Sequence, residues 1–374
     1  MKTFQPPFCP NSNCQFHAPS QAYESYRPWG SYRTRAFGAV PRYRCQSCGK
    51  TFSWQTFSID YYAKRLMDYE NLSQRLSSCE SLSAMGRAYN ASTDSISNRI
   101  SRAARQVLAF ESEVQATRQP NEDLAADGFE SFCRSQYFPN HISILVGSES
   151  QFVYAADHAT LRRKGQMTEE QKKKRQRLED IFRPPPGAIE DSFALISLEL
   201  VRVKDDGRHH PLILWTDQHK AYPRALQHNP HIARMIESGE IRHETISSRK
   251  QRTRQNPLFP VNYIDREIRK DLHEHVRESV CFGRNVNRQM ERLALYLFRH
   301  NFKKTHRARN HPESHAEFAG YDRAQIESKF TGLWEDRAWY SRTVLADWME
   351  KIWRRLYQTP LAAAPDSLPA YALQ

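Results

Sequence analysis

One continuous run of bulky apolar side chains, PLILWTD at residues 211–217, predicts a β-strand that is buried on both faces. The run ends in Asp217, and the sequence that follows it, QHKAY, is typical of the start of a helix. Asp217 is therefore expected at the carboxyl edge of a sheet, where ligands bind in α/β proteins. An acid at this position can also simply cap the following helix, so its role depends on its neighbours.

Apolar and alternating segments predict the rest of this sheet. Residues 124–132, 141–147 and 151–157 are expected to form three consecutive strands, and the short turn between the last two favours antiparallel pairing. Apolar residues at helical spacing predict a helix over 190–203, and residues 241–246 predict a final strand. The predicted order is therefore three strands, a helix, a strand, a helix and a strand. The ribonuclease-H-like fold has this order.

A late amphipathic helix, residues 286–298, carries an acid on its apolar face. That face begins at Met290, and Glu291 falls inside it. Burying a carboxylate is costly unless it is protonated, paired or bound to a cation. Arg288 or Arg292 offers an ion pair, but we favour a metal-binding role for Glu291.

Residues 59–119 are expected to be helical and to contain a helix-turn-helix. A short helix over 81–90 ends at Asn90, and a second helix begins at Ser92 or Thr93 with a polar, basic face. This layout is typical of DNA-binding helix pairs, although a plain helical bundle with a solvated basic face has the same pattern. The candidate DNA contacts on the second helix are Asn98, Arg99, Arg102 and Arg105.

Two close pairs of cysteines near the start of the chain indicate a zinc ribbon. Their spacing brings two pairs of soft ligands together, as tetrahedral zinc requires, whereas four unligated thiols in a small core is the alternative. His17 is a substitute ligand if Cys9 is not used. The predicted zinc ligands are Cys9, Cys14, Cys45 and Cys48.

The charge balance favours a polyanionic partner. The chain has 374 residues, with 55 Lys and Arg against 42 Asp and Glu and a formal net charge of +13. Nucleic acid is the first candidate, since no apolar run is long enough to span a membrane and residues 1–9 do not resemble a signal peptide. We therefore expect a cytoplasmic protein. A further basic cluster that we expect to face DNA consists of Arg249, Lys250, Arg252 and Arg254.

Three acids on separate elements suggest one metal-dependent reaction. Asp127 lies on the first strand, Asp217 ends the fourth and Glu291 lies on the late helix. Carboxylates from separate elements can hold two Mg²⁺ ions, which activate a water or a 3′-hydroxyl and stabilise the leaving oxygen in phosphoryl transfer.

Several motifs together resemble bacterial insertion-sequence DDE transposases with an N-terminal zinc ribbon. They are YRCQSCGKTF, the helix-turn-helix, AADGF, LWTDQHKAY and the block NPLFPVNYIDREIRKDLHEHVRESVCFGRNVNRQMERLALYLFRHNF, and they span roughly residues 9–305.

The resemblance implies a ribonuclease-H-like catalytic domain that cuts at the terminal inverted repeats of a mobile element and joins the freed 3′-hydroxyl to target DNA. It implies two Mg²⁺ or Mn²⁺ ions as cofactors beside a structural Zn²⁺, a homo-oligomer assembled on paired ends of double-stranded DNA, and association with the bacterial nucleoid. The implied metal-binding and catalytic triad is Asp127, Asp217 and Glu291. Asp157 is an alternative first acid, and the alternatives for the third are Glu267, Glu274 and Glu278.

The expected fold class is a multidomain α+β protein. Its predicted parts are a zinc ribbon (1–58), a helix-turn-helix module (59–119), a ribonuclease-H-like α/β catalytic domain (120–310, with a charged insert near 160–187) and a C-terminal helix with a flexible tail (311–374). The alternative function is a non-catalytic, sequence-specific DNA-binding regulator derived from a transposase.

Overall fold

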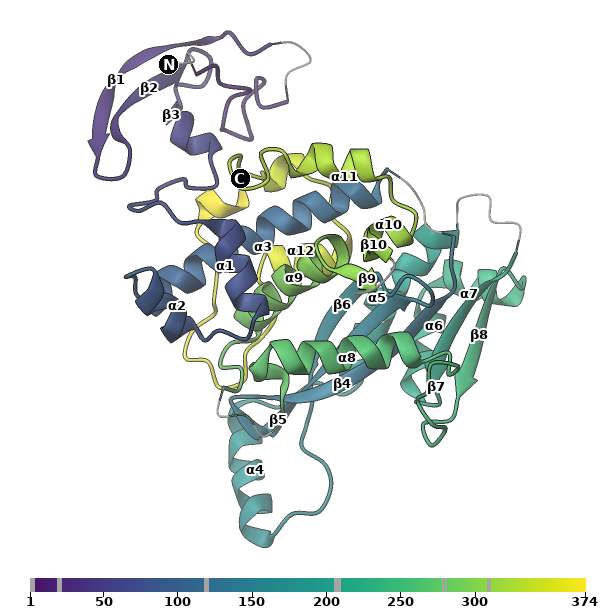
Figure 1. The fold of residues 1–374 in the computed structure, drawn as a ribbon. Coiled ribbons are helices and arrows are strands. Elements are labelled where there is room, and N and C mark those ends of the chain that lie inside the picture. The colour runs from purple at the N-terminus through teal and green to yellow at the C-terminus, as the bar shows by residue number, and fades with distance from the viewer. Residues whose placement is uncertain are drawn as a thin grey trace.

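The chain folds into a mixed α/β structure in which a layer of helices lies between a small three-stranded module and a five-stranded sheet (Figure 1). The computed structural model describes residues 4–18, 22–117, 121–204, 210–277, 279, 281–307 and 311–374. In this part of the chain, no helix is long and apolar enough to cross a membrane.

The five-stranded sheet has the order β6-β5-β4-β7-β8. Its strands are β4 (Leu124–Cys133), β5 (Ser135–Gly147), β6 (Val153–Thr160), β7 (Leu212–Asp217) and β8 (Ile241–Ile246). β4 and β6 pair with β5 in antiparallel fashion, whereas β4, β7 and β8 run parallel to one another. β7 pairs with the start of β4, at Leu124 and Ala125, so the carboxyl end of β7 lies beside the first half of β4.

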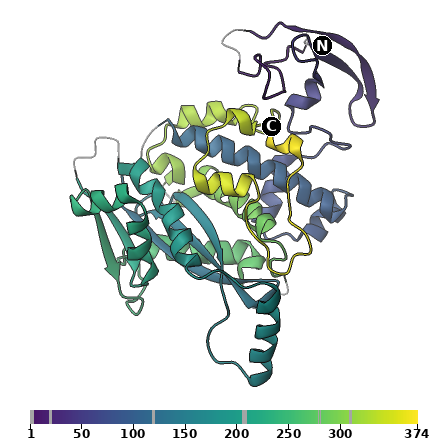
Figure 2. The same cartoon turned by 180° about the vertical axis from the view of Figure 1, so that it is seen from behind.

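Helices cover both faces of this sheet. On one face lie α5 (Ala188–Lys204), α6 (Ala221–His228) and α7 (Pro230–Glu237), and on the other lie α8 (Phe259–Asp271) and α9 (Val286–Phe302). Ser192 on α5 donates a hydrogen bond to Ser143 on β5, while the guanidinium of Arg269 on α8 stacks over Phe129 on β4. Figure 1 shows α8 crossing the front of the sheet, and Figure 2 shows the opposite side.

The helical layer is built on α3 (Thr93–Gln115), which packs along α9. It follows α1 (Tyr69–Ser77) and α2 (Leu82–Ala88), and the Ser92 side chain caps it by accepting a hydrogen bond from Ser95 N. The tight turn after α2 uses a positive φ of 48° at Asn90, as the sequence predicts.

The N-terminal module consists of β1 (Tyr26–Thr34), β2 (Gly38–Cys45), β3 (Thr51–Ser53) and the short helix η1 (Trp54–Phe57). Its three strands pair in antiparallel fashion. Phe8 and Phe57 pack against Trp339, so the small aromatic core of the module is completed by a residue from the other end of the chain.

The charged insert contains α4 (Glu169–Ile181), a helix that projects away from the sheet (Figure 1). A capping box between Thr168 and Gln171 begins the helix. Glu179 joins the helix to the segment before it through an ion pair with Arg162, and it also pairs with Arg175 one turn earlier on α4.

The segment after α9 departs from the sequence prediction. Its elements are β9 (Thr305–Arg307), β10 (His311–Ser314), α10 (His315–Phe318), α11 (Arg323–Phe330), η3 (Tyr340–Arg342), α12 (Asp347–Trp353) and η4 (Ala370–Leu373). The remaining short helix, η2 (His273–His275), lies between α8 and α9. The amphipathic helix expected over 341–357 is much shorter, because Ala346 is extended (ψ 153°) and Arg355 takes a positive φ of 57°.

The apolar face of α12 covers the rest of the molecule, and Trp348 donates a hydrogen bond to Glu199 on α5. The tail, residues 359–374, was expected to be flexible. The structure instead packs it along the molecule, with Val286 N donating to Thr359 Oγ1 and Tyr340 N donating to the Gln374 carbonyl.

Candidate active site and metal centre

Asp127, within β4, lies beside Asp217, the last residue of β7. These strands pair in parallel with Ala125 opposite Trp215, and two further residues along each strand bring Asp127 beside Asp217. Side chains two residues apart on a strand point to the same face, so both carboxylates lie on the face that α8 covers. The structure thus brings together two of the three acids that the sequence nominates.

The surroundings of Asp127 favour its protonated form. Burial and the neighbouring charge of Asp217 raise the pKa of Asp127 to about 6. Gly128 N and the Tyr222 hydroxyl donate hydrogen bonds to Asp127 Oδ1, at 2.8 and 3.2 Å. Arg252 Nη2 lies 3.9 Å from Asp127 Oδ2, which partly offsets the repulsion between the two acids.

Asp265, on α8, is a third acid in this group, which the sequence analysis missed. It is buried, and its Oδ1 atom has no hydrogen-bond partner among the residues that the structure describes. Burial and the charge of Asp127 raise the pKa of Asp265 well above its ordinary value, while Arg269 and Arg252 lower it. An orphaned carboxylate oxygen facing other acids is a position that a hard cation would satisfy.

A signal for Asp265 exists in the sequence. Val261, Ile264 and Ile268 are spaced along one face of α8, and all three are buried. Asp265 falls within that face, with the same pattern that drew attention to Glu291.

The structure places Glu291 away from this edge of the sheet. On α9, Gln289 points to the sheet and accepts a hydrogen bond from Asn140 on β5, whereas Glu291 points to α3. Glu291 accepts hydrogen bonds from Ser101 at 2.7 Å and from Arg355 at 2.8 Å. Burial raises the pKa of Glu291, but the charges of Arg355, Arg288 and Arg105 outweigh this effect and lower the pKa overall. The ion pairs, and not a metal, explain this buried carboxylate.

The alternative acids also have partners of their own. Glu267 pairs with Lys304 and Lys270, and Glu274 pairs with Arg292. Asp157 is fully buried on the opposite face of the sheet from Asp127, where it accepts hydrogen bonds from Lys351 and Tyr357. Glu278 lies outside the described residues.

The basic cluster at 249–254 lies between β8 and α8, beside the acids. Arg249, Lys250 and Arg254 are exposed, while Arg252 is half-buried next to Asp127. Cations on this loop are therefore available to a polyanion that approaches the carboxylates.

The basic residues of α3 occupy positions different from those expected. Asn98 is exposed, but Arg99 pairs with Asp60, Arg102 donates to the carbonyls of Ile59 and Tyr61, and Arg105 lies against Glu291. These three guanidinium groups are buried because they join α3 to its neighbours. In the first half of α3, the exposed side chains are residues 93–95 and Asn98.

The four cysteines of the N-terminal module form one cluster. Among the described residues, they are the group of metal-ligating side chains whose ligand atoms all lie within 4.8 Å of one another. Cys9 Sγ is 3.5 Å from Cys48 Sγ, and Cys14 Sγ is 3.9 Å from Cys45 Sγ. Thiolates about 2.3 Å from a tetrahedral zinc ion are about 3.8 Å apart, so the cluster fits zinc.

Hydrogen bonds in the cluster favour a thiolate at Cys45. Burial raises its pKa, but the amide groups of Cys48 and Ser47 and the Tyr23 hydroxyl lower the pKa of Cys45 overall, to about 7. His17 is not a ligand, because its Nδ1 contacts the Cys9 carbonyl and its Nε2 contacts Ser341.

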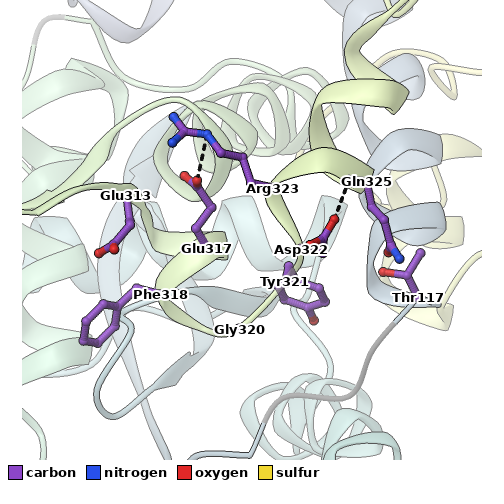
Figure 3. A pocket seen from close by; sticks show the side chains of 9 residues that line it. All are labelled: Thr117, Glu313, Glu317, Phe318, Gly320, Tyr321, Asp322, Arg323 and Gln325. Carbon is purple, nitrogen blue, oxygen red and sulfur yellow. Dashed lines mark hydrogen bonds and ion pairs between the residues drawn. The ribbon is translucent and has the colours of Figure 1, made fainter.

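A separate cavity of about 740 Å³ lies beside α10 and α11 (Figure 3). Figure 3 shows Glu317 turned toward Arg323, with which it forms an ion pair. It also shows Asp322 turned toward Gln325, and Asp322 accepts a hydrogen bond from the backbone N–H of Gln325. Both acids also serve helix starts, Glu317 in a capping box and Asp322 as an N-cap. Capping explains their positions, and none of the acids that the sequence nominates lines this cavity.

Comparisons with known proteins add little to this geometry. No protein-family model matches the sequence, and no curated protein matches it significantly. One solved structure with a similar chain is the cryo-EM structure of simian T-cell lymphotropic virus intasome in complex with PP2A regulatory subunit B56 gamma. The match has a TM-score of 0.30 and 13% sequence identity, and it covers 55% of this chain and 56% of that one.

Proposed function

We propose that this chain is a DNA transposase with a ribonuclease-H-like catalytic domain, which cuts DNA at the ends of a mobile element and joins them to a target. The observation that carries this proposal is that Asp127 on β4 lies beside Asp217 at the end of β7, with the buried Asp265 on α8 close enough for the charge of Asp127 to raise its pKa. The strand order β6-β5-β4-β7-β8, with one antiparallel and one parallel half, is the order expected for that domain.

The proposed metal-binding and catalytic residues are Asp127, Asp217 and Asp265. Mg²⁺ ions held by these carboxylates would supply an activated water or 3′-hydroxyl and neutralise charge on the leaving oxygen. The chain itself must ionise Asp127, and Tyr222 and Gly128 N stabilise the ionised form by donating hydrogen bonds to it. Arg252, with its basic loop, is placed to orient a DNA phosphate beside the acids.

The N-terminal parts would bind DNA. We propose that the zinc module and the α2–α3 pair, as a helix-turn-helix, recognise the element ends. Their exposed groups include the first turn of α3 and a hairpin on which Arg27 and Arg44 lie over Trp29. Base contacts from a helix start and phosphate contacts from arginines are both usual in such modules.

The test is strand cleavage of double-stranded oligonucleotides that carry the DNA sequences flanking the gene. Asp217→Asn and Asp265→Asn should each abolish Mg²⁺-dependent cleavage while DNA binding by fluorescence anisotropy is retained. Asp180→Asn, an exposed site on α4, is the matched control and should cleave like the parent. Undiminished cleavage by Asp217→Asn would contradict the proposal.

A non-catalytic DNA-binding regulator is the second candidate. It is favoured by one observation, namely that no three carboxylates of the described residues bring oxygens within 4.8 Å of one another. A titration with Mg²⁺, in which the stability of the folded protein is measured at each Mg²⁺ concentration, separates the two candidates. A catalytic site predicts stabilisation that Asp217→Asn removes, and a regulator predicts none.

A further inference from the structure

Four arginines line a small cavity between α3, α9 and the tail. We call it the arginine pocket, defined by Arg102 and Arg105 on α3, Arg288 on α9 and Arg355 after α12. The cavity has a volume of about 170 Å³, and tail residues 366–369 form its opposite wall. This volume is too small for a typical organic ligand, but it suits a single oxyanion.

The arginine pocket contains more positive than negative charge. In the described residues, its four guanidinium groups face two carboxylates, Glu291 and Asp366. Among the described residues, Arg102 has no carboxylate partner, and it donates instead to two backbone carbonyls and to Asn98. The pocket therefore has an excess of two positive charges, and three of its four arginines are nearly buried. Binding an anion would compensate these buried charges.

The neighbouring Tyr61 reports the same positive field. Burial alone raises the pKa of a phenol, yet the charges of Arg105, Arg102 and Arg337 lower the pKa of Tyr61 overall. Its hydroxyl accepts a hydrogen bond from Arg105 at 3.3 Å. The cationic field therefore favours a negatively charged group at this point in the cavity.

One negative charge in the pocket comes from the tail. Asp366 is the only charged side chain among residues 359–374. Its Oδ1 lies 3.2 Å from Arg355 Nη1, and its Oδ2 lies 3.4 Å from Arg288 Nε but accepts no hydrogen bond from the described part of the chain. Asp366 thus occupies the place of an anion without fully using the donors around it.

We propose that the arginine pocket is a phosphate-binding site that the tail closes, with Asp366 in place of the phosphate, so that tail and phosphate compete. Guanidinium groups match a phosphate with paired, charge-assisted hydrogen bonds and carry their charge at all physiological pH values. A phosphate has more acceptor oxygens than the single carboxylate of Asp366. It therefore satisfies more of the donors when the tail moves away.

The surroundings of the pocket favour a backbone phosphate of nucleic acid over free phosphate. Asn98 and Arg102 line both the arginine pocket and a larger cavity of about 1070 Å³ at the start of α3. That cavity is also lined by Lys64, Arg65 and Arg87. This choice of source rests on the proposed function, whereas the phosphate site itself does not.

The first arm of the test uses inorganic phosphate and the full-length chain. Asp366→Asn should bind phosphate about tenfold more tightly in calorimetric titration, as expected if the tail closes the pocket roughly nine-tenths of the time. Glu327→Gln, an exposed acid on α11, changes the net charge equally and should bind phosphate like the parent. Equal affinities for Asp366→Asn and Glu327→Gln would overturn the proposal.

The second arm uses a double-stranded oligonucleotide in place of phosphate. If the ligand is a backbone phosphate, Asp366→Asn should bind DNA more tightly, and Arg288→Gln should weaken binding and lower the salt dependence by about one phosphate contact. A gain for inorganic phosphate alone would support the site with free phosphate as its ligand.

Hydrogen exchange of the tail completes the test. Saturating phosphate should increase exchange in residues 359–374, because the tail leaves the pocket, and unchanged exchange would overturn the competition between tail and phosphate. The same measurements on Asp217→Asn separate this inference from the proposed function. That variant should lose cleavage but keep the response of the tail, since the acids at the sheet edge do not line the arginine pocket.

Discussion

Two buried acids in this protein, Asp265 and Glu291, are held by opposite means. Glu291 lies on α9 among three arginines, which stabilise its charge. Asp265 lies on α8 with an unpartnered oxygen, and nearby Asp127 adds repulsion. Charge compensation within the fold marks Glu291 as structural, whereas incomplete compensation by Arg269 and Arg252 marks Asp265 as a candidate ligand.

This contrast predicts opposite effects of neutral substitutions. Glu291→Gln leaves buried guanidinium groups without their carboxylate and should lower the free energy of unfolding by roughly 3–5 kcal/mol. Asp265→Asn removes an unpaired buried acid and should leave stability unchanged or raised, while abolishing metal-dependent cleavage. Urea unfolding monitored by circular dichroism measures the difference, and a strongly destabilised Asp265→Asn would contradict it.

The raised pKa of Asp127 predicts a pH-dependent cost to the fold. Because the folded-state pKa is about 6 and the ordinary value 3.8, the contribution of Asp127 to stability is present below about pH 4 and is lost as pH rises through 6. Without metal, Asp127→Asn should therefore be more stable than the parent at pH 8, by up to about 3 kcal/mol, and equal to it at pH 4.

Thermal unfolding in a chelating buffer at the two pH values measures this difference. Asp180→Asn, on the exposed face of α4, should show no difference between pH 4 and pH 8 relative to the parent. Cleavage should follow the opposite course and fall below pH 6, because a protonated Asp127 is a poor ligand for a cation.

The sequence could identify Asp127 and Asp217 because each ends or occupies a strand with a clear apolar pattern. It could not rank Asp265 against Glu291, since both are acids on apolar helix faces. Their difference comes from Arg355, which lies 64 positions beyond Glu291 in the sequence and meets it only in the folded chain.

At the level of elements, the core strands follow closely from apolar runs. β7 and β8 fall where the sequence predicts them, and β4 exceeds its expected length by one residue. β5 begins earlier than expected, at Ser135, because it extends antiparallel to β4 through Tyr137 and Phe138, although Pro139 between them and the expected strand is a residue that disfavours strands. Helix α12 was overestimated since its periodicity continues past Arg355, whose backbone ends the helix.

The zinc module is expected to depend on its metal. Its own core is a few aromatic residues, too small to fold alone, so zinc should supply much of its folding free energy. Cys45→Ser, or chelation of the metal, should abolish protection from hydrogen exchange in residues 22–58 and leave the five-stranded sheet protected.

Metal content by mass spectrometry should be one zinc per chain for the parent and markedly less for Cys45→Ser. Cys281→Ser changes an exposed cysteine outside the cluster and should retain full zinc. Equal zinc content in Cys45→Ser and the parent would rule out the four-cysteine site.

For the whole molecule, the interface between the zinc module and residues 335–342 joins the two ends of the chain. Ile59 N donates to the Glu335 carbonyl, Arg337 N donates to the Phe57 carbonyl, and Trp339 packs on Phe8. The orientation of the module relative to the helical layer therefore depends on the late part of the sequence.

Removing Trp339 should release the module. Trp339→Ala should cost roughly 3 kcal/mol, as for other buried aromatic truncations, and should expose residues 54–59 to proteolysis. The matched control is Trp29→Ala, which removes a tryptophan that is 39% exposed on β1 and should leave the cleavage pattern unchanged. Limited proteolysis followed by mass spectrometry distinguishes the two variants.

The contact between His17 and Ser341 spans 324 positions, and this separation has a consequence during synthesis. At about 5–20 residues per second, a ribosome needs roughly 16–65 s to proceed from one to the other. For that interval the nascent zinc module has no docking partner, and the rings of Phe8 and Phe57 remain open to chaperones. The zinc module is thus expected to dock only after Ser341 has left the ribosome.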